Sequence, residues 1–275
     1  MRILITLSIF CLIVAVAQAT EISKSSIPAQ QGGIIITTFD EQVDEGIISF
    51  DDKKYPVSGN TGYIPISVDT APGSHSIKYN DTKIVINIAS GNFGSININL
   101  PKSKKSETKK KDFPQATKDV YGALCKYNKD ISYLDDFIMP IEGEISEPFG
   151  TKRVLNHKTP WGYHGGVDIP ADAGTPIQAS NGGIVELSDK LPVYGNVVVI
   201  NHGQGFATIY MHMQERHVKE GDTVTKGEII GLVGSTGLST GPHLHWGLYL
   251  HGVKVDPIRW LAQQHQKDAD NMAKK

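Results

Sequence analysis

The chain has 275 residues, which predicts either one large domain or two of modest size. Hydrophobic residues make up 39%, enough for a packed core and too many for a disordered chain. A net charge of −2 argues against a general nucleic-acid binder, because such proteins carry a basic surplus. Two cysteines cannot form a disulfide scaffold or a multi-cysteine zinc site. A metal site would therefore use the ten histidines and the carboxylates.

Residues 1–19 have the three parts of a secretory signal peptide. The second residue is an arginine, an apolar run covers residues 3–16, and residues 17–19 are a small-x-small cleavage site. The alternative is an uncleaved membrane anchor, but the run is short for a span of about 20 residues. We expect a periplasmic or secreted envelope protein that is not integral to the membrane after signal cleavage. Cys11 would leave with the signal, so Cys125 would be a lone thiol.

Residues 20–100 show short β-like runs separated by turn residues. In one of them Ile64, Ile66 and Val68 alternate onto one face. About seven short strands at this spacing predict a small antiparallel β-sandwich. We see no catalytic cluster among these residues.

A basic segment follows the expected sandwich. Residues 101–112 hold six Lys and one Glu and predict a solvated linker, with an electrostatic tether to an anionic envelope surface as the alternative. We place the basic linker with its short helices at residues 101–137, because a helical apolar stripe lies within 114–136. Residues 138–262 are again rich in β-like runs, and residues 263–275 form a polar tail.

One histidine motif in the second half combines a potential ligand pair with two glycines. His164 and Asp168 flank Gly165 and Gly166. In an extended strand the two side chains would lie about 13 Å apart, too far for one ion with bonds of about 2 Å. The glycine pair permits a bend or bulge that brings the two side chains together.

Two further segments place histidines on expected strands. His243 and His245 are two residues apart, so they share one face of a strand while Leu244 points into a core. By the same alternation Tyr210 shares a face with His212 and would line the same cleft.

The three segments together supply four histidines and one aspartate. A catalytic zinc site commonly has three protein ligands and an open water position, and a carboxylate with two histidines is such a set. The remaining two histidines would serve proton transfer and transition-state stabilisation. The sequence has no HExxH motif, which excludes a thermolysin-like helical site.

Other short motifs surround these segments, from about residue 140 to 261. They include FGxxR at 149–153, HGGVD at 164–168, GTP at 174–176, TIYMH at 208–212 and GSTGxSTGPHLH at 234–245. With these motifs residues 138–262 resemble the LytM/lysostaphin-type zinc endopeptidases. Residues 27–100 are similar, more loosely, to a β-sandwich that precedes this domain in some Gram-negative members.

The resemblance implies a fold and a site. The fold is mainly β, with a narrow zinc-containing groove in the C-terminal antiparallel domain. One Zn²⁺ per chain would be held by His164, Asp168 and His245. The family's two further active-site histidines match His212 and His243, and their division into base and oxyanion stabiliser stays open.

The resemblance also implies a reaction, which is hydrolysis of peptide cross-links of peptidoglycan by zinc-activated water. In a Gram-negative cell the bond would be the D-alanyl–diaminopimelate bridge. The partner would be the peptidoglycan peptide stem, and we expect a monomer. Tyr210 would contact substrate, and Arg153 would either bind substrate or brace a loop.

Two other functions remain open. A non-catalytic LytM-like activator of a cell-wall amidase would lack the zinc ligands, whereas all three positions are filled here. A wall-binding module would use the N-terminal sandwich as its working part. We also hypothesise that residues 20–136 restrain the active site, because they precede the expected cleft as an extra domain and linker.

Overall fold

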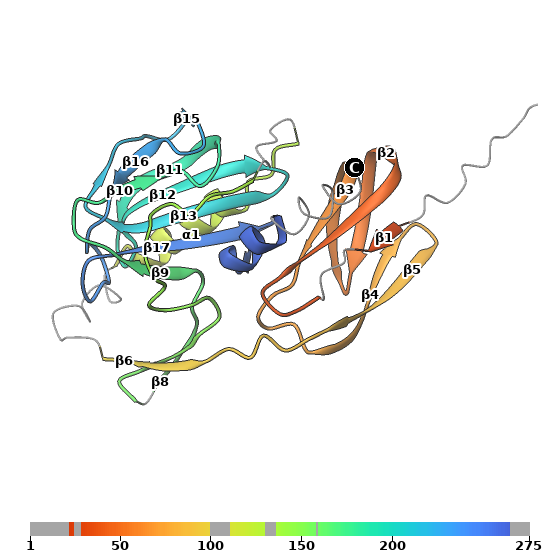
Figure 1. The fold of residues 1–275 in the computed structure, drawn as a ribbon, viewed down its shortest axis with the longest axis horizontal. Coiled ribbons are helices and arrows are strands. Elements are labelled where there is room, and N and C mark those ends of the chain that lie inside the picture. The colour runs from red at the N-terminus through yellow and green to blue at the C-terminus, as the bar shows by residue number, and fades with distance from the viewer. Residues whose placement is uncertain (1–21, 25–28, 100–110, 130–135, 158, 265–275) are drawn as a thin grey trace, which may run out of the picture.

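The computed structural model describes residues 22–24, 29–99, 111–129, 136–157 and 159–264. The expected signal peptide, the basic run 101–110 and the tail from residue 265 lie outside the described residues. The described chain forms two β bodies, joined along one side by strand β6 (Figure 1). The predicted mainly β fold is confirmed.

The N-terminal body is one curled antiparallel sheet. Its strands are β1 (Ile22–Lys24), β2 (Ile34–Phe50), β3 (Lys53–Pro65), β4 (Gly73–Tyr79) and β5 (Thr82–Ile88). They follow the order β1-β2-β4-β5, and β3 pairs with β2. Register shifts near Val43 interrupt the long β2–β3 ladder, and such bulges bend strands and increase their twist. The curled sheet encloses a core that includes Phe39, Ile48, Ile64 and Ile77.

This body differs in detail from the seven short strands expected of a sandwich. The 17 residues of β2 form a single strand, longer than any of the short strands that the sequence pattern predicts. The alternation of Ile64 and Ile66 is confirmed, since both side chains are buried. The alternation of apolar residues predicted which side chains face the core. It did not predict the bulges that curl a single sheet, because bulges leave no alternating pattern in the sequence.

The C-terminal body is built on a seven-stranded antiparallel sheet in the order β15-β11-β12-β13-β17-β18, with β9 also paired to β17. The strands are β9 (Val167–Pro170), β11 (Gly183–Leu191), β12 (Gly195–Gly203), β13 (Phe206–Met213), β15 (Thr223–Val224), β17 (His243–Leu250) and β18 (Val253–Val255). Its central strands are almost wholly buried, because both faces are covered.

Alternating side chains of this sheet pack into two separate cores on its opposite faces. Val198, Tyr210 and Trp246 face the larger core, which also takes in the small sheet of β10 (Pro176–Gln178), β14 (Glu215–Arg216) and β16 (Ile229–Leu232). Val199 and Ile209 face the opposite way, onto helix α1 (Phe113–Leu124).

Helix α1 lies within the expected linker and confirms the apolar stripe expected there. A proline stands in its first turn, where a missing N–H costs nothing. Its buried side chains are those of Ala116, Val120, Ala123 and Leu124. No helix in the described ranges is long and apolar enough to cross a membrane.

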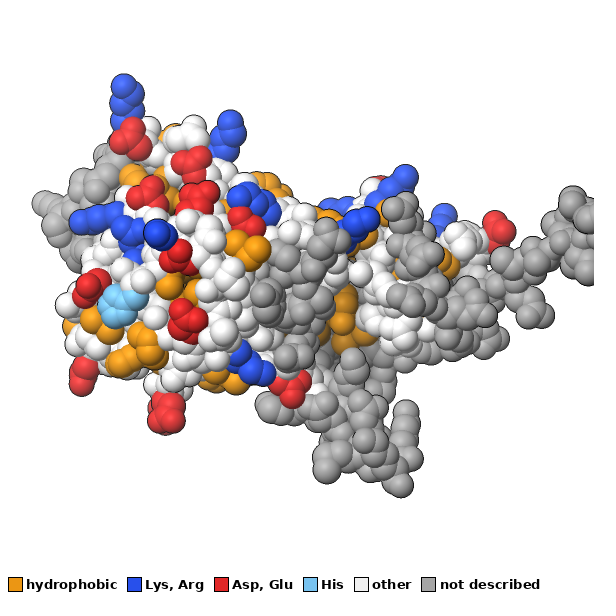
Figure 2. All heavy atoms as spheres, turned by 90° about the horizontal axis from the view of Figure 1, so that it is seen from above, with side chains coloured by type: hydrophobic (Ala, Val, Ile, Leu, Met, Phe, Trp, Pro, Cys, Tyr) orange, Lys and Arg blue, Asp and Glu red, His pale blue; other side chains and the backbone are white. Residues whose placement is uncertain are grey.

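The two bodies share an apolar interface. Phe206 and Leu250 of the large sheet pack with Ile34 of β2 and with Trp260, which lies on the helical segment 257–264. The Tyr63 ring of β3 meets the Phe206 ring edge-on, with centroids 5.1 Å apart. Acidic and basic side chains are interspersed over the face of the C-terminal body in Figure 2, as expected from a net charge near zero.

A second connection runs along the outside of the molecule. β6 (Ser95–Ile98), β7 (Lys152–Leu155) and β8 (Thr159–Tyr163) form a three-stranded sheet in that order. β6 continues from the N-terminal body and pairs in parallel with β7. It thereby carries a segment of the N-terminal half to the rim of the C-terminal body (Figure 1).

Candidate metal centre

The candidate ligands are brought together by the pairing of β9 with β17. Asp168 lies directly opposite His245 in this antiparallel ladder. Gly166 makes the approach possible, because a Cβ there would lie 2.3 Å from the backbone oxygen of Trp246. His164, just before β9, then folds back so that its Nε2 atom lies 3.0 Å from Oδ1 of Asp168. The bend expected at the glycine pair therefore occurs.

Three donor atoms converge on one point. Nε2 of His164 and Nδ1 of His245 lie 3.0 Å apart, and Nδ1 of His245 lies 2.7 Å from Oδ1 of Asp168. A tetrahedral ion with bonds of about 2.1 Å holds its donors about 3.4 Å apart. Small outward movements of the three side chains would therefore admit such an ion.

The hydrogen bonds around His164 test whether this set suits a cation. Its Nδ1 lies 3.0 Å from the carbonyl oxygen of Pro148, which can only accept, so Nδ1 carries a proton. A neutral His164 then presents a lone pair at Nε2 towards the carboxylate of Asp168. Two acceptors at this separation need a positive charge between them, either a proton or a metal ion. The donor set therefore fits a metal cation.

Burial and charge set the ionisation of the group. Burial alone would raise the pKa of Asp168, but its interactions with the rings of His164 and His245 outweigh burial and hold that pKa well below its usual range. Burial lowers the pKa of His245 to about 4. At neutral pH the site therefore offers a carboxylate and a neutral His245, which are the forms that bind metals.

The two further histidines stand beside this cluster with one ring nitrogen anchored. Nδ1 of His212 donates to the carbonyl of Thr236 at 2.9 Å, and Nδ1 of His243 donates to that of Gly241 at 2.8 Å. The two rings are 4.9 Å apart between centroids. Burial, with smaller contributions from His243 and His245, lowers the pKa of His212 to about 3, so its ring is neutral and able to accept a proton.

The expected role of Tyr210 is corrected by the structure. Its side chain is fully buried in the larger core, and its hydroxyl accepts a 2.8 Å hydrogen bond from the backbone N–H of Ser180. Strict alternation fails because His212 has a φ of 62° and β13 bulges there, with Met211 and His212 both opposite Val197. The bulge turns His212 to the groove and leaves Tyr210 in the core.

Arg153 lies at the site, but its hydrogen bonds go to protein carboxylates. Its Nε and Nη2 atoms donate to the two oxygens of Glu147 at 2.6 and 2.9 Å. Nη2 also donates to Oδ2 of Asp168 at 3.0 Å, which leaves Oδ1 for the cluster. Of the two roles expected for Arg153, the contacts favour bracing. Sequence reasoning missed Glu147, because it meets Arg153 only through the fold.

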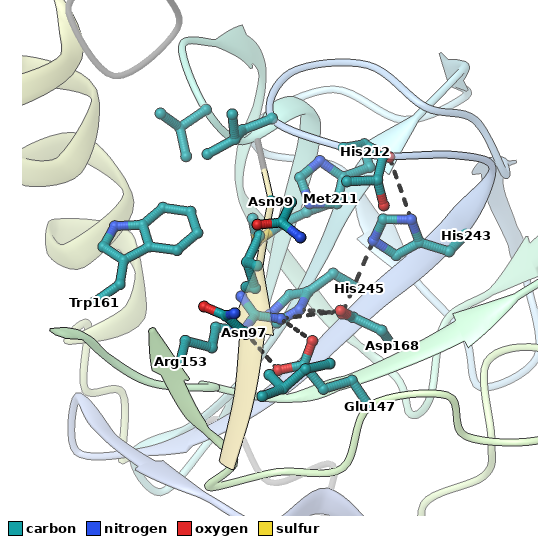
Figure 3. Close-up of a pocket in the computed structure, with 16 residues that line it drawn as sticks. Asn97, Asn99, Glu147, Arg153, Trp161, Asp168, Met211, His212, His243 and His245 are labelled. Atoms are coloured by element: carbon teal, nitrogen blue, oxygen red, sulfur yellow. Dashed lines mark hydrogen bonds and ion pairs between the residues drawn. The ribbon is translucent and has the colours of Figure 1, made fainter. Parts of the chain in front are cut away.

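A groove of about 360 Å³ opens onto the cluster. In Figure 3 the labelled histidines and Asp168 lie on one side of the β6 ribbon, and Trp161 lies on the other. The groove is lined by Ile96, Asn97, Ile98, Asn99, Glu147, Arg153, Trp161, Asp168, Val193, Met211, His212, Leu238, Ser239, Thr240, His243 and His245. The residues of β6, Trp161 and Met211 had not been predicted from sequence.

The remaining described histidines lie away from the cluster. His202 is buried, with Nδ1 2.6 Å from the carbonyl of Gly182 and Nε2 2.8 Å from Oγ1 of Thr208. His251 stands in the turn between β17 and β18.

The fold and the donor set define a mainly β protein with a candidate metal centre. Residues 162–257 match peptidase family M23. The chain is 43% identical over 114 residues to the DD-carboxypeptidase/endopeptidase Mpg of Neisseria meningitidis, covering 42% of this chain and 26% of Mpg. It is 42% identical over 115 residues to the peptidoglycan DD-endopeptidase ShyA of Vibrio cholerae, covering 42% of this chain and 27% of ShyA.

The matched segment thus spans about a quarter of these curated relatives. A solved structure extends the likeness to most of the chain. It is a Pseudomonas aeruginosa protein assigned to peptidase family M23, with a TM-score of 0.68 and 25% identity. The comparison covers 86% of this chain and 96% of that one, so both β bodies are included.

Proposed function

We propose that this protein is a zinc-dependent endopeptidase that cleaves peptide cross-links of peptidoglycan. The observation that carries the proposal is the convergence of His164, Asp168 and His245 at the floor of an open groove, with His212 and His243 beside them. Family M23 and the activities in the names of Mpg and ShyA support it. His₂Asp with an open position suits zinc.

The three ligands and the two further histidines each have a chemical task in this proposal. A zinc ion held by the three ligands supplies a Lewis acid that polarises the scissile carbonyl and lowers the pKa of water. His212 and His243 direct their free Nε2 atoms into the groove, where one accepts a proton from water and the other hydrogen-bonds the developing oxyanion. Their anchored Nδ1 atoms fix which nitrogen is available. Asp168 keeps its negative charge throughout, because its pKa is held low.

The substrate class follows from the relatives and the groove. We assign the D-alanyl–diaminopimelate bridge as the bond cleaved and the peptidoglycan peptide stem as the partner. A groove bordered by strand β6 suits an extended peptide. The cell envelope is the matching location, with residues 1–19 as the signal for export.

Elemental analysis and digestion assays test this proposal together. Purified wild-type protein should contain one zinc per chain and release cross-link fragments from purified peptidoglycan. A His245→Ala variant should lose both properties, while a His251→Ala variant, altered in a turn outside the groove, should retain both. Wild-type protein that binds no zinc would overturn the proposal. Cleavage seen only when an amidase is added would instead support the amidase-activator function.

A further inference from the structure

β6 borders the groove with its edge. Four successive residues, from Ile96 to Asn99, line it. Successive side chains of a strand point to opposite faces, so one face cannot supply all four. The groove therefore meets the edge of β6, where backbone groups are presented.

Hydrogen bonds to β7 show which backbone groups point away from that strand. The backbone N–H groups of Lys152 and Asn156 donate to the carbonyls of Gly94 and Ile98, at 2.8 and 2.9 Å. The N–H and C=O of one strand residue point to the same side, and this side alternates along the strand. Asn97 therefore directs both groups away from β7. In the described part of the chain β6 is the end strand of its sheet.

We propose that β6 binds the substrate peptide as an added strand, through the backbone N–H and C=O of Asn97. This inference rests on the proposed function and deepens it, because it names how an extended peptide is held beside the cluster. Strand addition of this kind draws its affinity from main-chain hydrogen bonds. The added strand would lie beside β6 in the groove that Leu238 and Thr240 also line.

Strand β6 lies outside the segment that matches the family model. It precedes the segment 162–257 that matches the family, and it is an extension of the N-terminal body. The N-terminal half thereby supplies one wall of the groove. That wall is fixed by parallel pairing to β7, the strand that carries Arg153, so the edge and the ligand cluster hold a set position relative to each other.

An Asn97→Pro substitution tests the inference. It removes the N–H that faces the groove and also the side-chain Oδ1 that accepts a hydrogen bond from the N–H of His157, but it leaves the backbone bonds to β7 in place. Proline is tolerated at such an edge position. We expect KM for a soluble cross-linked peptide to rise about fivefold to tenfold, the effect of one lost hydrogen bond to the substrate, with kcat and zinc content unchanged. Asn97→Ala loses the same side-chain bond to His157 but retains the backbone donor, so its KM should rise less than that of Asn97→Pro.

A modified substrate gives an independent measurement on wild-type protein. A cross-linked peptide N-methylated at successive amides should show a raised KM at the position whose N–H pairs with the C=O of Asn97. That penalty should add to the effect of Asn97→Pro, because each change removes a different hydrogen bond. An unchanged KM in Asn97→Pro would overturn the inference. A fall in KM would also overturn it, because it would mean that β6 hinders substrate binding. Failure of wild-type protein to cleave any cross-link would instead refute the proposed function.

Discussion

Arg153 offers the most exacting test of how this metal centre is built. Its guanidinium holds Oδ2 of Asp168 at 3.0 Å while both oxygens of Glu147 hold the guanidinium. This arrangement leaves Oδ1 as the single oxygen directed at the ligand histidines. Replacing Arg153 with alanine would free the carboxylate to rotate and to offer both oxygens.

The size of the effect follows from the role of such partners. Loss of a group that orients a metal ligand typically weakens metal binding 10- to 100-fold, or about 1.4–2.7 kcal/mol. We expect Arg153→Ala to lie in this range because it removes Asp168's charged partner and leaves Glu147 unpaired at a site where both carboxylates are mostly buried. The zinc affinity of Arg153→Lys should lie between those of wild type and Arg153→Ala, since a lysine keeps the positive charge but not the planar guanidinium.

Zinc affinity measured by competition with a chelator checks this prediction. The absorption spectrum of the cobalt-substituted protein adds a readout of coordination number, which should change if Asp168 becomes bidentate. Lys152→Ala is the matched control, because it removes one positive charge from the neighbouring, exposed position of β7. Equal zinc affinities in Arg153→Ala and Lys152→Ala would refute the reasoning.

Three further predictions concern the backbone, the chemistry and the pH dependence. Gly166→Ala should abolish zinc binding and lower Tm, because its Cβ would meet the Trp246 backbone oxygen at 2.3 Å, whereas Gly165→Ala should be mild since only a flexible lysine side chain lies at 3.0 Å. His212→Ala should keep its zinc and lose activity by roughly 10²–10⁴-fold in kcat. Burial lowers the pKa of His202 from 6.5 to about 4, so its neutral form stabilises the fold fully above pH 6.5 and the contribution is lost as pH falls towards 4. Between pH 5 and 6 the free energy of unfolding of His202→Gln, measured with denaturant, should therefore change less with pH than that of wild type, by about 1 kcal/mol per pH unit. An equal change of this free energy with pH in both proteins would contradict this.

The metal cluster could be predicted because its signals are local. The glycine pair between His164 and Asp168 and the two-residue spacing of His243 and His245 each encode a backbone shape. Tyr210 could not be placed, because a bulge at His212 reverses the alternation and no turn residue marks it.

The rest of the site depends on contacts between distant segments. Glu147 and Arg153 meet through a hairpin and a bridge between Glu147 and Asp168, so neither stands in a recognisable spacing. Strand β6 pairs with β7 more than 50 residues away. An alternating Ile and Asn pattern predicts that such a strand exists, but not which strand it pairs with.

Mass analysis of the digestion products tests the central claim most directly. Purified cross-linked peptidoglycan dimers should be converted by the zinc-loaded protein alone into two disaccharide-peptide monomers, with one water added across the peptide bridge. The account predicts these products with wild-type protein and their absence with His245→Ala. Intact dimers after digestion, or release of peptides from the sugar with the bridge still joined, would contradict it.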